Sequence, residues 1–159
     1  MAFALPSPWH GIAGGITAPQ GFEASGITAG LKASGNPDLS LLLAPPDAVC
    51  AGTFTTSLVR AACVDLCAQR LVASGGHARA VLTNSGQANA CTGERGLADS
   101  LTATAALAAG LGLAPEQVLI CSTGVIGVPI PMDTLLAGFE PLVAALAADQ
   151  SAGDAAARE

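Results

Sequence analysis

The most informative stretch of this chain reads NSGQANACTG and runs from Asn84 to Gly93. It follows the short apolar run Ala78–Leu82 and precedes Glu94–Ala109, where helix-forming residues carry apolar side chains at helical spacing. A strand, a loop of small residues and a helix in this order are typical of an α/β unit. The stretch therefore predicts a sheet with helices packed against it.

A second unit of the same kind follows about one helix-length later. Val118–Cys121 has strand-forming residues and leads into STGVIG, residues Ser122–Gly127. Two short helices are expected next, Thr134–Phe139 with Asp133 as its N-cap and a second one from Pro141 to Ala148. After Ala148 the sequence is polar and alanine-rich, and no capped element is expected there.

The part of the chain before these units is predicted to add further strands. Leu39–Leu43, Val49–Phe54 and Ala61–Leu66 are short apolar runs of β-forming residues, and Pro45-Pro46-Asp47 is expected to turn the chain between the first two. The residues up to about Gly35 are expected to form an irregular entry and a turn. We therefore expect a single domain over residues 1–159, of the α/β (α+β) class, with a mixed sheet.

Composition narrows the class of protein. Half of the 159 residues are apolar, only 11% are charged and 3% are aromatic, so the chain can bury a core built from small side chains. Such a composition suits close backbone packing or a large subunit interface. We therefore expect a partner chain.

Charge and hydropathy argue against two kinds of partner. The net charge is −6 and the six Lys and Arg residues are scattered, so we expect no nucleic-acid site. The apolar stretches are too short to cross a bilayer, and the N-terminus lacks the basic region of a secretory signal. A cytoplasmic protein that does not enter a membrane is expected.

The metal-ligating and nucleophilic residues do not form a recognisable site. The chain has five cysteines and two histidines, His10 and His77, without metal-ligand spacing, so we expect buried free thiols and no metal. Cys91 could act as a nucleophile, but Arg95 is the only basic residue near it in the sequence that could lower its pKa. No Ser-His-Asp or Cys-His arrangement can be placed.

Two glycine-punctuated segments, Asn84–Gly93 and Ser122–Gly127, offer hydrogen-bond donors. They carry hydroxyls on Ser85, Thr92, Ser122 and Thr123, amides on Asn84 and Asn89, and unencumbered backbone N–H groups at Gly86, Gly93 and Gly124. A hydroxyl and a glycine N–H directed at one point make an oxyanion hole. Turns stabilised by their own Ser, Thr and Asn side chains are the alternative, and residue types alone leave both open.

Five segments in order resemble the N-terminal part of the ornithine acetyltransferase family, the glutamate N-acetyltransferases of arginine biosynthesis. They are GITAPQGF at 15–22, AGTFTT at 51–56, NSGQANACTG at 84–93, STGVIG at 122–127 and the pair Pro131-Met132. The similarity runs from about Gly14 to Ala148.

The resemblance implies an enzyme made as a precursor that cleaves itself into an α and a β chain, with an architecture of the N-terminal-nucleophile type. The N-terminal threonine of the β chain is then the nucleophile. It takes acetyl from N-acetylornithine and passes it to glutamate without a cofactor, and some members also accept acetyl-CoA. An α2β2 heterotetramer is implied as well.

The resemblance also implies roles for individual residues. Thr123, through its hydroxyl, and Gly124, through its backbone N–H, correspond to the pair that stabilises the tetrahedral oxyanion. Asn84, Ser85, Gly86, Asn89 and Ser122 are expected to shape and support the pocket wall.

Three departures from the family pattern matter. This chain has Ser57 where members usually have Asn, and Cys63 where they have Pro. In the family, the α chain continues past the position of Glu159 through a Thr-Thr-Asp segment and a substrate-binding Lys to an Ala-Thr cleavage bond. We therefore expect an α-chain portion that lacks its C-terminal part and the nucleophile. An N-terminal-nucleophile amidase or aminopeptidase subunit and a non-catalytic binding subunit are the alternatives.

Overall fold

The structure is a computed structural model that describes residues 8–158. Its centre is one four-stranded sheet in the order β1-β2-β3-β4, formed by β1 (Glu23–Ile27), β2 (Leu39–Leu43), β3 (Ala80–Gln87) and β4 (Val118–Val125). The pairs β1–β2 and β2–β3 are antiparallel, whereas β3–β4 is parallel. The expected mixed sheet of an α/β protein is confirmed.

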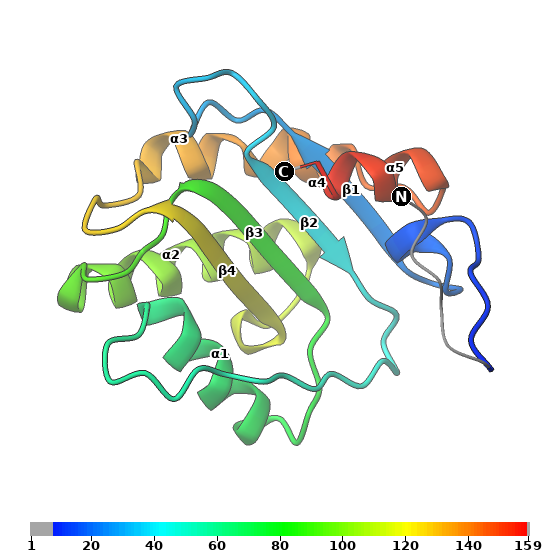
Figure 1. Ribbon diagram of the computed structural model, residues 1–159, viewed down its shortest axis with the longest axis horizontal. Helices are drawn as coiled ribbons and strands as arrows, with labels where there is room; N and C mark the ends of the chain where they lie inside the picture. The colour runs from blue at the N-terminus through cyan, green and yellow to red at the C-terminus, as the bar shows by residue number, and fades with distance from the viewer. Residues whose placement is uncertain (1–7, 159) are drawn as a thin grey trace.

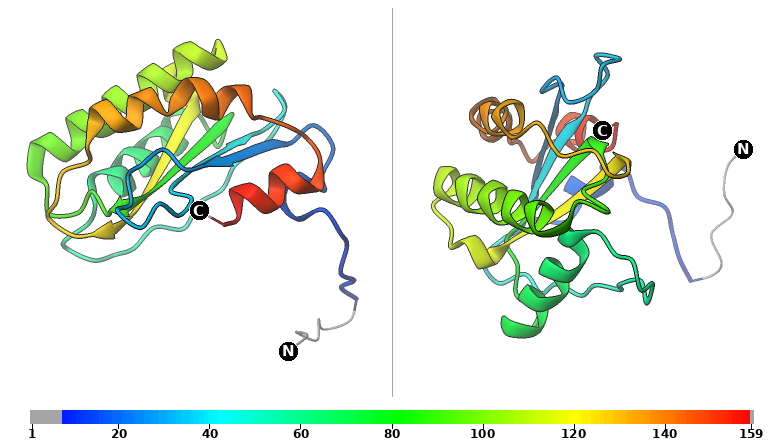
Figure 2. Two further views of the ribbon diagram at one scale, coloured as in Figure 1. Left: turned by 90° about the horizontal axis from the view of Figure 1, so that it is seen from above. Right: turned by 90° about the vertical axis from the view of Figure 1, so that its left-hand side faces the viewer.

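Helices cover the two faces of the sheet unequally (Figures 1 and 2). The helices are α1 (Ala62–Ala73), α2 (Gly93–Leu111), α3 (Met132–Ala137), α4 (Phe139–Ala144) and α5 (Gln150–Ala156), with 3-10 turns at Gly15–Thr17 and Pro115–Gln117. Helices α2, α3 and α4 lie behind the sheet in Figure 1, and α1 packs against α2 and β4. Helix α5 lies on the opposite face, over β1 and β2. We call that opposite face the open face, because the helix covers only its β1–β2 half.

The core lies between the sheet and the helices behind it. Leu41, Leu82 and Ile120 are register partners across β2, β3 and β4, and all three are fully buried. Leu107 of α2 and Leu135 of α3 are buried in the same cluster. Because side chains alternate along a strand, every second residue of these short apolar runs reaches this core.

Two of the predicted strands are wrong. Val49–Phe54 lies in an irregular segment on the surface, because its β-forming residues have no partner strand among the described residues. Ala61–Leu66 belongs to α1 instead. That helix buries Cys63, Leu66, Cys67, Arg70 and Leu71, a helical spacing that becomes evident only over the longer window to Ala73.

One strand and one helix were not predicted, and they pack against each other. β1 reads EASGI, and a Cβ on Gly26 would lie 2.3 Å from the carbonyl oxygen of Ala155 in α5. The strand is built from small residues because the helix backbone comes this close. Asp149 caps α5 by accepting the N–H of Ala152 at 2.9 Å, so the expectation of no capped element after Ala148 was wrong.

The predicted long helix, the Pro45 turn and the two short helices after β4 are present with shifted boundaries. Helix α2 matches the predicted Glu94–Ala109, and the N–H of Ala48 donates to the carbonyl of Pro45 in the expected turn. The two short helices after β4 are present as α3 and α4. Asp133 lies inside the first turn of α3, whose N-cap is Pro131, so the predicted cap is wrong. No helix among residues 8–158 combines the length and apolar character that a membrane crossing requires.

Candidate active site

The two glycine-punctuated segments lie side by side, although 38 residues separate them along the chain. β3 and β4 are in register over eight pairs, which places Asn84 beside Ser122, Ser85 beside Thr123 and Gly86 beside Gly124. The sequence predicted that both strands end before these residues. They instead form the last half of each strand, because the parallel ladder continues through Gln87 and Val125.

Gly86 and Gly124 are register partners in the parallel ladder, and their backbones lie close together. Their φ angles are +121° and +127°, a region that residues with a side chain rarely adopt. A Cβ on Gly124 would lie 2.4 Å from the carbonyl carbon of Gly86, and one on Gly86 would lie 3.0 Å from the carbonyl oxygen of Leu31. Only glycine fits at the Gly124 position.

Thr123 and Gly124 are exposed, as are the residues that follow them up to Pro129, whereas Ser122 is only partly exposed. Ser122 lies on the same side of β4 as Ile120, and its Oγ donates to Oδ1 of the fully buried Asn84 at 2.7 Å. Alternation along β4 therefore directs the side chain of Thr123 toward the open face. A hydroxyl and a glycine backbone are thus presented to solvent at adjacent positions on the last half of β4.

Asn89 ties the segment after β3 to helix α2. Its Nδ2 donates to the carbonyl of Gly96 at 3.0 Å and to Oγ of Ser100 at 2.8 Å, and its Oδ1 accepts the hydroxyl of Thr92 at 2.9 Å. The side chain is buried, and φ is +49°. The amide is occupied by internal partners, which is the geometry of a structural support. The predicted roles of Asn84, Ser85, Gly86, Asn89 and Ser122 in the pocket wall stay predictions.

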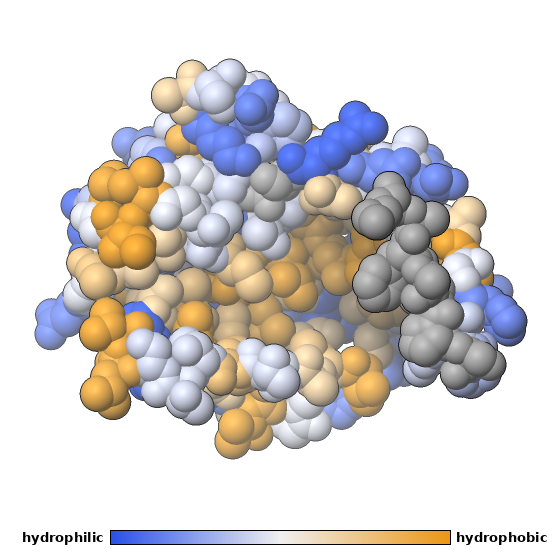
Figure 3. Space-filling model, viewed as in Figure 1, coloured by the Kyte–Doolittle hydropathy of each residue, from blue (hydrophilic) through white to orange (hydrophobic). Residues whose placement is uncertain are grey.

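A hollow on the open face borders β3. It has a volume of about 270 Å³ and lies between β2, β3 and α5, with Ile16, Leu42, Val81 and Ala156 among its lining residues. Figure 3 shows apolar side chains gathered in a depression over the middle of this face. The exposed Thr123 is therefore on the same face as an apolar surface.

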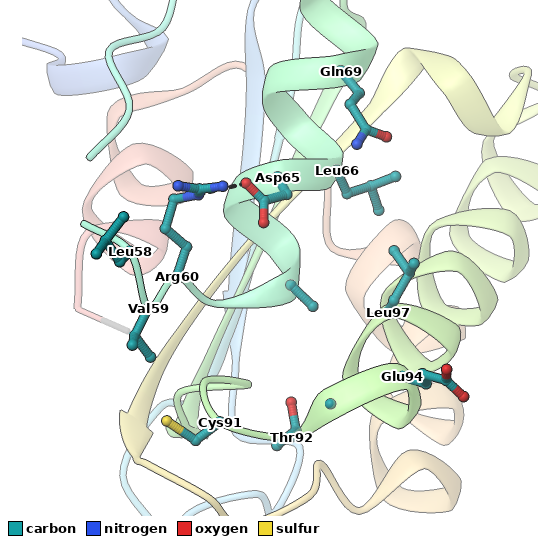
Figure 4. Close-up of a pocket in the computed structure, with 12 residues that line it drawn as sticks. Leu58, Val59, Arg60, Asp65, Leu66, Gln69, Cys91, Thr92, Glu94 and Leu97 are labelled. Atoms are coloured by element: carbon teal, nitrogen blue, oxygen red, sulfur yellow. Dashed lines mark hydrogen bonds and ion pairs between the residues drawn. The ribbon is translucent and has the colours of Figure 1, made fainter. Parts of the chain in front are cut away.

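A larger hollow, of about 470 Å³, lies elsewhere, between the segment that precedes α1 and the first turn of α2 (Figure 4). Nε of Arg60 is 2.6 Å from Oδ1 of Asp65 in its wall, and Leu58 and Cys91 border it. Neither Thr123 nor Gly124 lines it. Sequence reasoning missed the Arg60–Asp65 pair, for which the only signal was two opposite charges five residues apart around a helix start.

The five cysteines, all within the described residues, form no disulfides. Cys63 and Cys67 are buried as expected, but Cys91 and Cys121 are exposed, so the expectation of buried thiols was wrong for these two. Burial raises the pKa of Cys67 to about 11, although the carbonyl and N–H of Ile120 both contact its Sγ at 3.3 Å. Cys67 is consequently an unreactive core thiol.

Arg70 is the one buried cation near this core among the described residues. Its Nη1 donates to the carbonyl of Val118 at 2.5 Å, and burial lowers its pKa. His10 and His77 are exposed. Within residues 8–158, no three His, Cys, Asp or Glu side chains are placed to hold a metal ion together.

The model of the ArgJ family matches residues 23–158 of the sequence. The chain belongs to the ArgJ family. The family that the sequence motifs indicated is therefore confirmed.

Relatives in the ArgJ family are similar over almost the whole chain. The chain is 71% identical over 157 residues to the arginine biosynthesis bifunctional protein ArgJ of Parasynechococcus marenigrum. The matched region covers 99% of this chain and 38% of that protein. The chain is 72% identical over 156 residues to the protein of the same name from Prochlorococcus marinus strain MIT 9313, covering 98% and 36%. The chain thus spans less than two fifths of the length of these ArgJ relatives.

Solved ArgJ structures share the fold. The ornithine acetyltransferase of Mycobacterium tuberculosis, determined in complex with ornithine, is 45% identical with a TM-score of 0.87, over 91% of this chain and 77% of that chain. The arginine biosynthesis bifunctional protein ArgJ of Bacillus halodurans is 34% identical with a TM-score of 0.85, over 91% and 74%. The sheet and helices described above are therefore those of ArgJ.

Proposed function

We propose that this chain supplies the oxyanion hole of an acetyltransferase that moves acetyl from N-acetylornithine to glutamate. The observation that carries the proposal is the exposed Thr123–Gly124 pair, presented on the last half of a parallel strand pair in a chain of the ArgJ family. The similarity to an ornithine acetyltransferase with bound ornithine supports the substrate class. Because the chain spans less than two fifths of its curated relatives, the activity belongs to the assembled protein.

The proposed reaction is the one that the resemblance implies, and the exposed Thr123–Gly124 pair supports it. The hydroxyl of the β chain's N-terminal threonine attacks the acetyl carbonyl carbon, and the carbonyl oxygen becomes an oxyanion. The hydroxyl of Thr123 and the N–H of Gly124 donate to that oxyanion. Its collapse breaks the C–N bond, the departing amine of ornithine takes the proton, and an acetyl ester remains on the threonine.

The second half-reaction uses the same donors. The amine of glutamate attacks the ester carbonyl, a second oxyanion forms at the same place, and N-acetylglutamate leaves as the threonine hydroxyl is restored. One pair of donors therefore serves both half-reactions, and each donor of this kind accelerates a reaction by roughly a hundredfold to a thousandfold. No cofactor is needed for either step.

The rest of the proposal concerns partners and location. The β chain that carries the nucleophile would dock on the open face, and an α2β2 heterotetramer is the proposed assembly. The five cysteines form no disulfides among the described residues, which supports a cytoplasmic location, where cysteines stay reduced. Some members of the family also accept acetyl-CoA as an acetyl donor, and the proposal includes this second donor on that ground alone.

Thr123 is the residue to test, in the enzyme assembled with the segments that its relatives carry beyond this region. Thr123→Ala should lower kcat for acetyl transfer about a hundredfold to a thousandfold, and Thr123→Ser, which keeps a hydroxyl, should retain most of the rate. A wild-type kcat in Thr123→Ala would refute the assignment. Acetate release from N-acetylornithine that is independent of glutamate would instead indicate an amidase.

A further inference from the structure

Asp38 is a buried carboxylate at the carboxyl-terminal end of the loop that joins β1 to β2. Its side chain is fully buried, and four successive backbone N–H groups donate to it: Ala29 to Oδ1 at 2.6 Å, and Gly30, Leu31 and Lys32 to Oδ2 at 3.1, 2.6 and 2.9 Å. Hydrogen bonds to an ionised acceptor are shorter and stronger than neutral ones. One side chain therefore determines the path of residues 29–32.

The backbone of Asp38 links the same loop to both neighbouring strands. Its N–H donates to the carbonyl of Ile27 in β1 at 3.1 Å, and its carbonyl accepts the N–H of Ser85 in β3 at 2.9 Å. The loop thus leaves and re-enters the sheet at a point directly beside Ser85. Ser85 is the register partner of Thr123.

The folded loop packs against the paired glycines Gly86 and Gly124. The carbonyl of Leu31 accepts Nε2 of Gln87 at 3.2 Å. A Cβ added to Gly86 would lie 3.0 Å from the same carbonyl oxygen. A Cβ added to Gly124 would collide with the backbone of Gly86. A continuous series of contacts therefore runs from the Asp38 carboxylate through Leu31 and Gly86 to Gly124.

We propose that Asp38 is a positioning residue for the oxyanion donors: it holds Leu31 against Gly86 and thereby fixes where the backbone of Gly124 presents its N–H. This proposal rests on the proposed function of Thr123 and Gly124. Asp38 does not touch the reacting atoms. It acts on the transition state through the contact between Gly86 of β3 and Gly124 of β4.

Asp38→Asn is the discriminating substitution, because it keeps the size of the side chain. An amide offers one oxygen where the carboxylate offers two, so either Ala29 or the three following N–H groups lose their acceptor and face an NH2 group. The loop should loosen and the donor N–H should move. A misplacement of about 1 Å can cost on the order of a hundredfold in rate.

The test is a double-mutant cycle in the assembled enzyme, with Asp47→Asn as the control. Asp47 is an exposed residue after β2, so its substitution makes the same charge change away from the site. We expect Asp38→Asn to lower kcat between about tenfold and a hundredfold with KM within about twofold, because the donors act on the transition state. In a Thr123→Ala background, Asp38→Asn should lower kcat by much less, since the two residues serve one oxyanion.

Each outcome separates the two proposals. Wild-type kcat for Asp38→Asn beside a large loss for Thr123→Ala overturns the role of Asp38 and leaves the oxyanion hole standing. Fully additive losses in the cycle also overturn it, because a general structural defect adds to the loss of the hydroxyl. No loss for Thr123→Ala refutes the proposed function and, with it, the role of Asp38.

A gentler variant covers the case in which Asp38→Asn does not fold. Gln87→Ala removes only the hydrogen bond from Nε2 to the Leu31 carbonyl and leaves the Asp38 carboxylate in place. It should lower kcat by a few fold, again non-additively with Thr123→Ala. Amide hydrogen exchange should report faster exchange at residues 29–32 in this variant, and unchanged exchange together with unchanged kcat would overturn the proposed series of contacts.

Discussion

Oγ of Ser122 on β4 donates a hydrogen bond to Oδ1 of Asn84 on β3 at 2.7 Å. The two residues are register partners in the parallel ladder, and Asn84 is fully buried. This polar contact lies one residue before the Thr123 position and on the covered side of the sheet. It joins the two strands behind the donors that the open face presents.

Removing the Ser122 hydroxyl should destabilise the sheet. In Ser122→Ala, the buried Oδ1 of Asn84 loses its donor, and such a loss costs about 1–3 kcal/mol. Urea unfolding should show this decrease in the free energy of unfolding. Ser34→Ala, in an exposed loop, is the matched control and should stay within about 0.5 kcal/mol of wild type. Equal stabilities for the two variants would mean that the contact contributes nothing.

A comparison of Gly124→Ala with Gly127→Ala should separate the cost of a steric clash from the cost of backbone strain. At Gly124 a Cβ would collide with the backbone of Gly86, whereas at Gly127, where φ is +79°, no atom lies within 4 Å. Gly127→Ala should therefore cost about 1–2 kcal/mol from conformation alone. Gly124→Ala should cost clearly more, because overpacking adds about 1–3 kcal/mol. Thermal unfolding of both variants measures the difference, and equal losses would contradict the close approach of the Gly86 and Gly124 backbones.

Thiol labelling should divide the cysteines into two groups. Cys91 and Cys121 are exposed, while Cys67 is buried with a pKa of about 11, so about one Cys67 thiol in a thousand is ionised at pH 8. A thiol reagent at pH 8 should modify Cys91 and Cys121 quickly and Cys67 only after unfolding. Peptide mass spectrometry identifies the modified sites. Rapid labelling of Cys67 in the native chain would disprove the packing of α1 on β4.

The cap of α5 should make stability depend on pH. The Ser151 hydroxyl and the Ala152 N–H donate to the Asp149 carboxylate and hold its pKa below the ordinary value of 3.8. The stabilisation is therefore complete well above pH 3.8 and is lost as the pH falls through the lower, folded-state pKa. The stability difference between wild type and Asp149→Ala should be present at pH 6 and shrink below pH 3.8. A difference that does not change with pH would contradict the capping role.

The elements that the sequence predicted well are those whose own side chains reach the core. β2, β3, β4 and α2 carry apolar residues at strand or helix spacing, and each lies at its predicted place, although β3 and β4 continue beyond their predicted ends. Val49–Phe54 shows the limit of this signal, because a strand also needs a partner strand, which local residue types do not specify. The strand predicted at Ala61–Leu66 shows that a short window hides a helical period.

The residue types of the candidate site could be named from the sequence, but their geometry could not. The motifs identified Thr123 and Gly124, and they indicated that Asn84–Gly93 supports them. They could not indicate that Gly86 and Gly124 share one register pair, because pairing between strands depends on the whole sheet. Asp38 was missed for a related reason: its four donors are backbone groups, which leave no mark in the sequence.

The packing of α5 on β1 has a consequence for the order in which the molecule folds. Thr17 donates its hydroxyl to the carbonyl of Asp149 across 132 positions of sequence, and Gly26 meets Ala155 over a similar separation. Contacts so distant along the chain form slowly, since a long loop must close before they give any stabilisation. On the ribosome, β1 emerges long before α5 has been made. β1, the first strand in the sequence and an edge strand of the sheet, is thus among the last elements to complete its packing. Its small residues are covered only when α5 has been made.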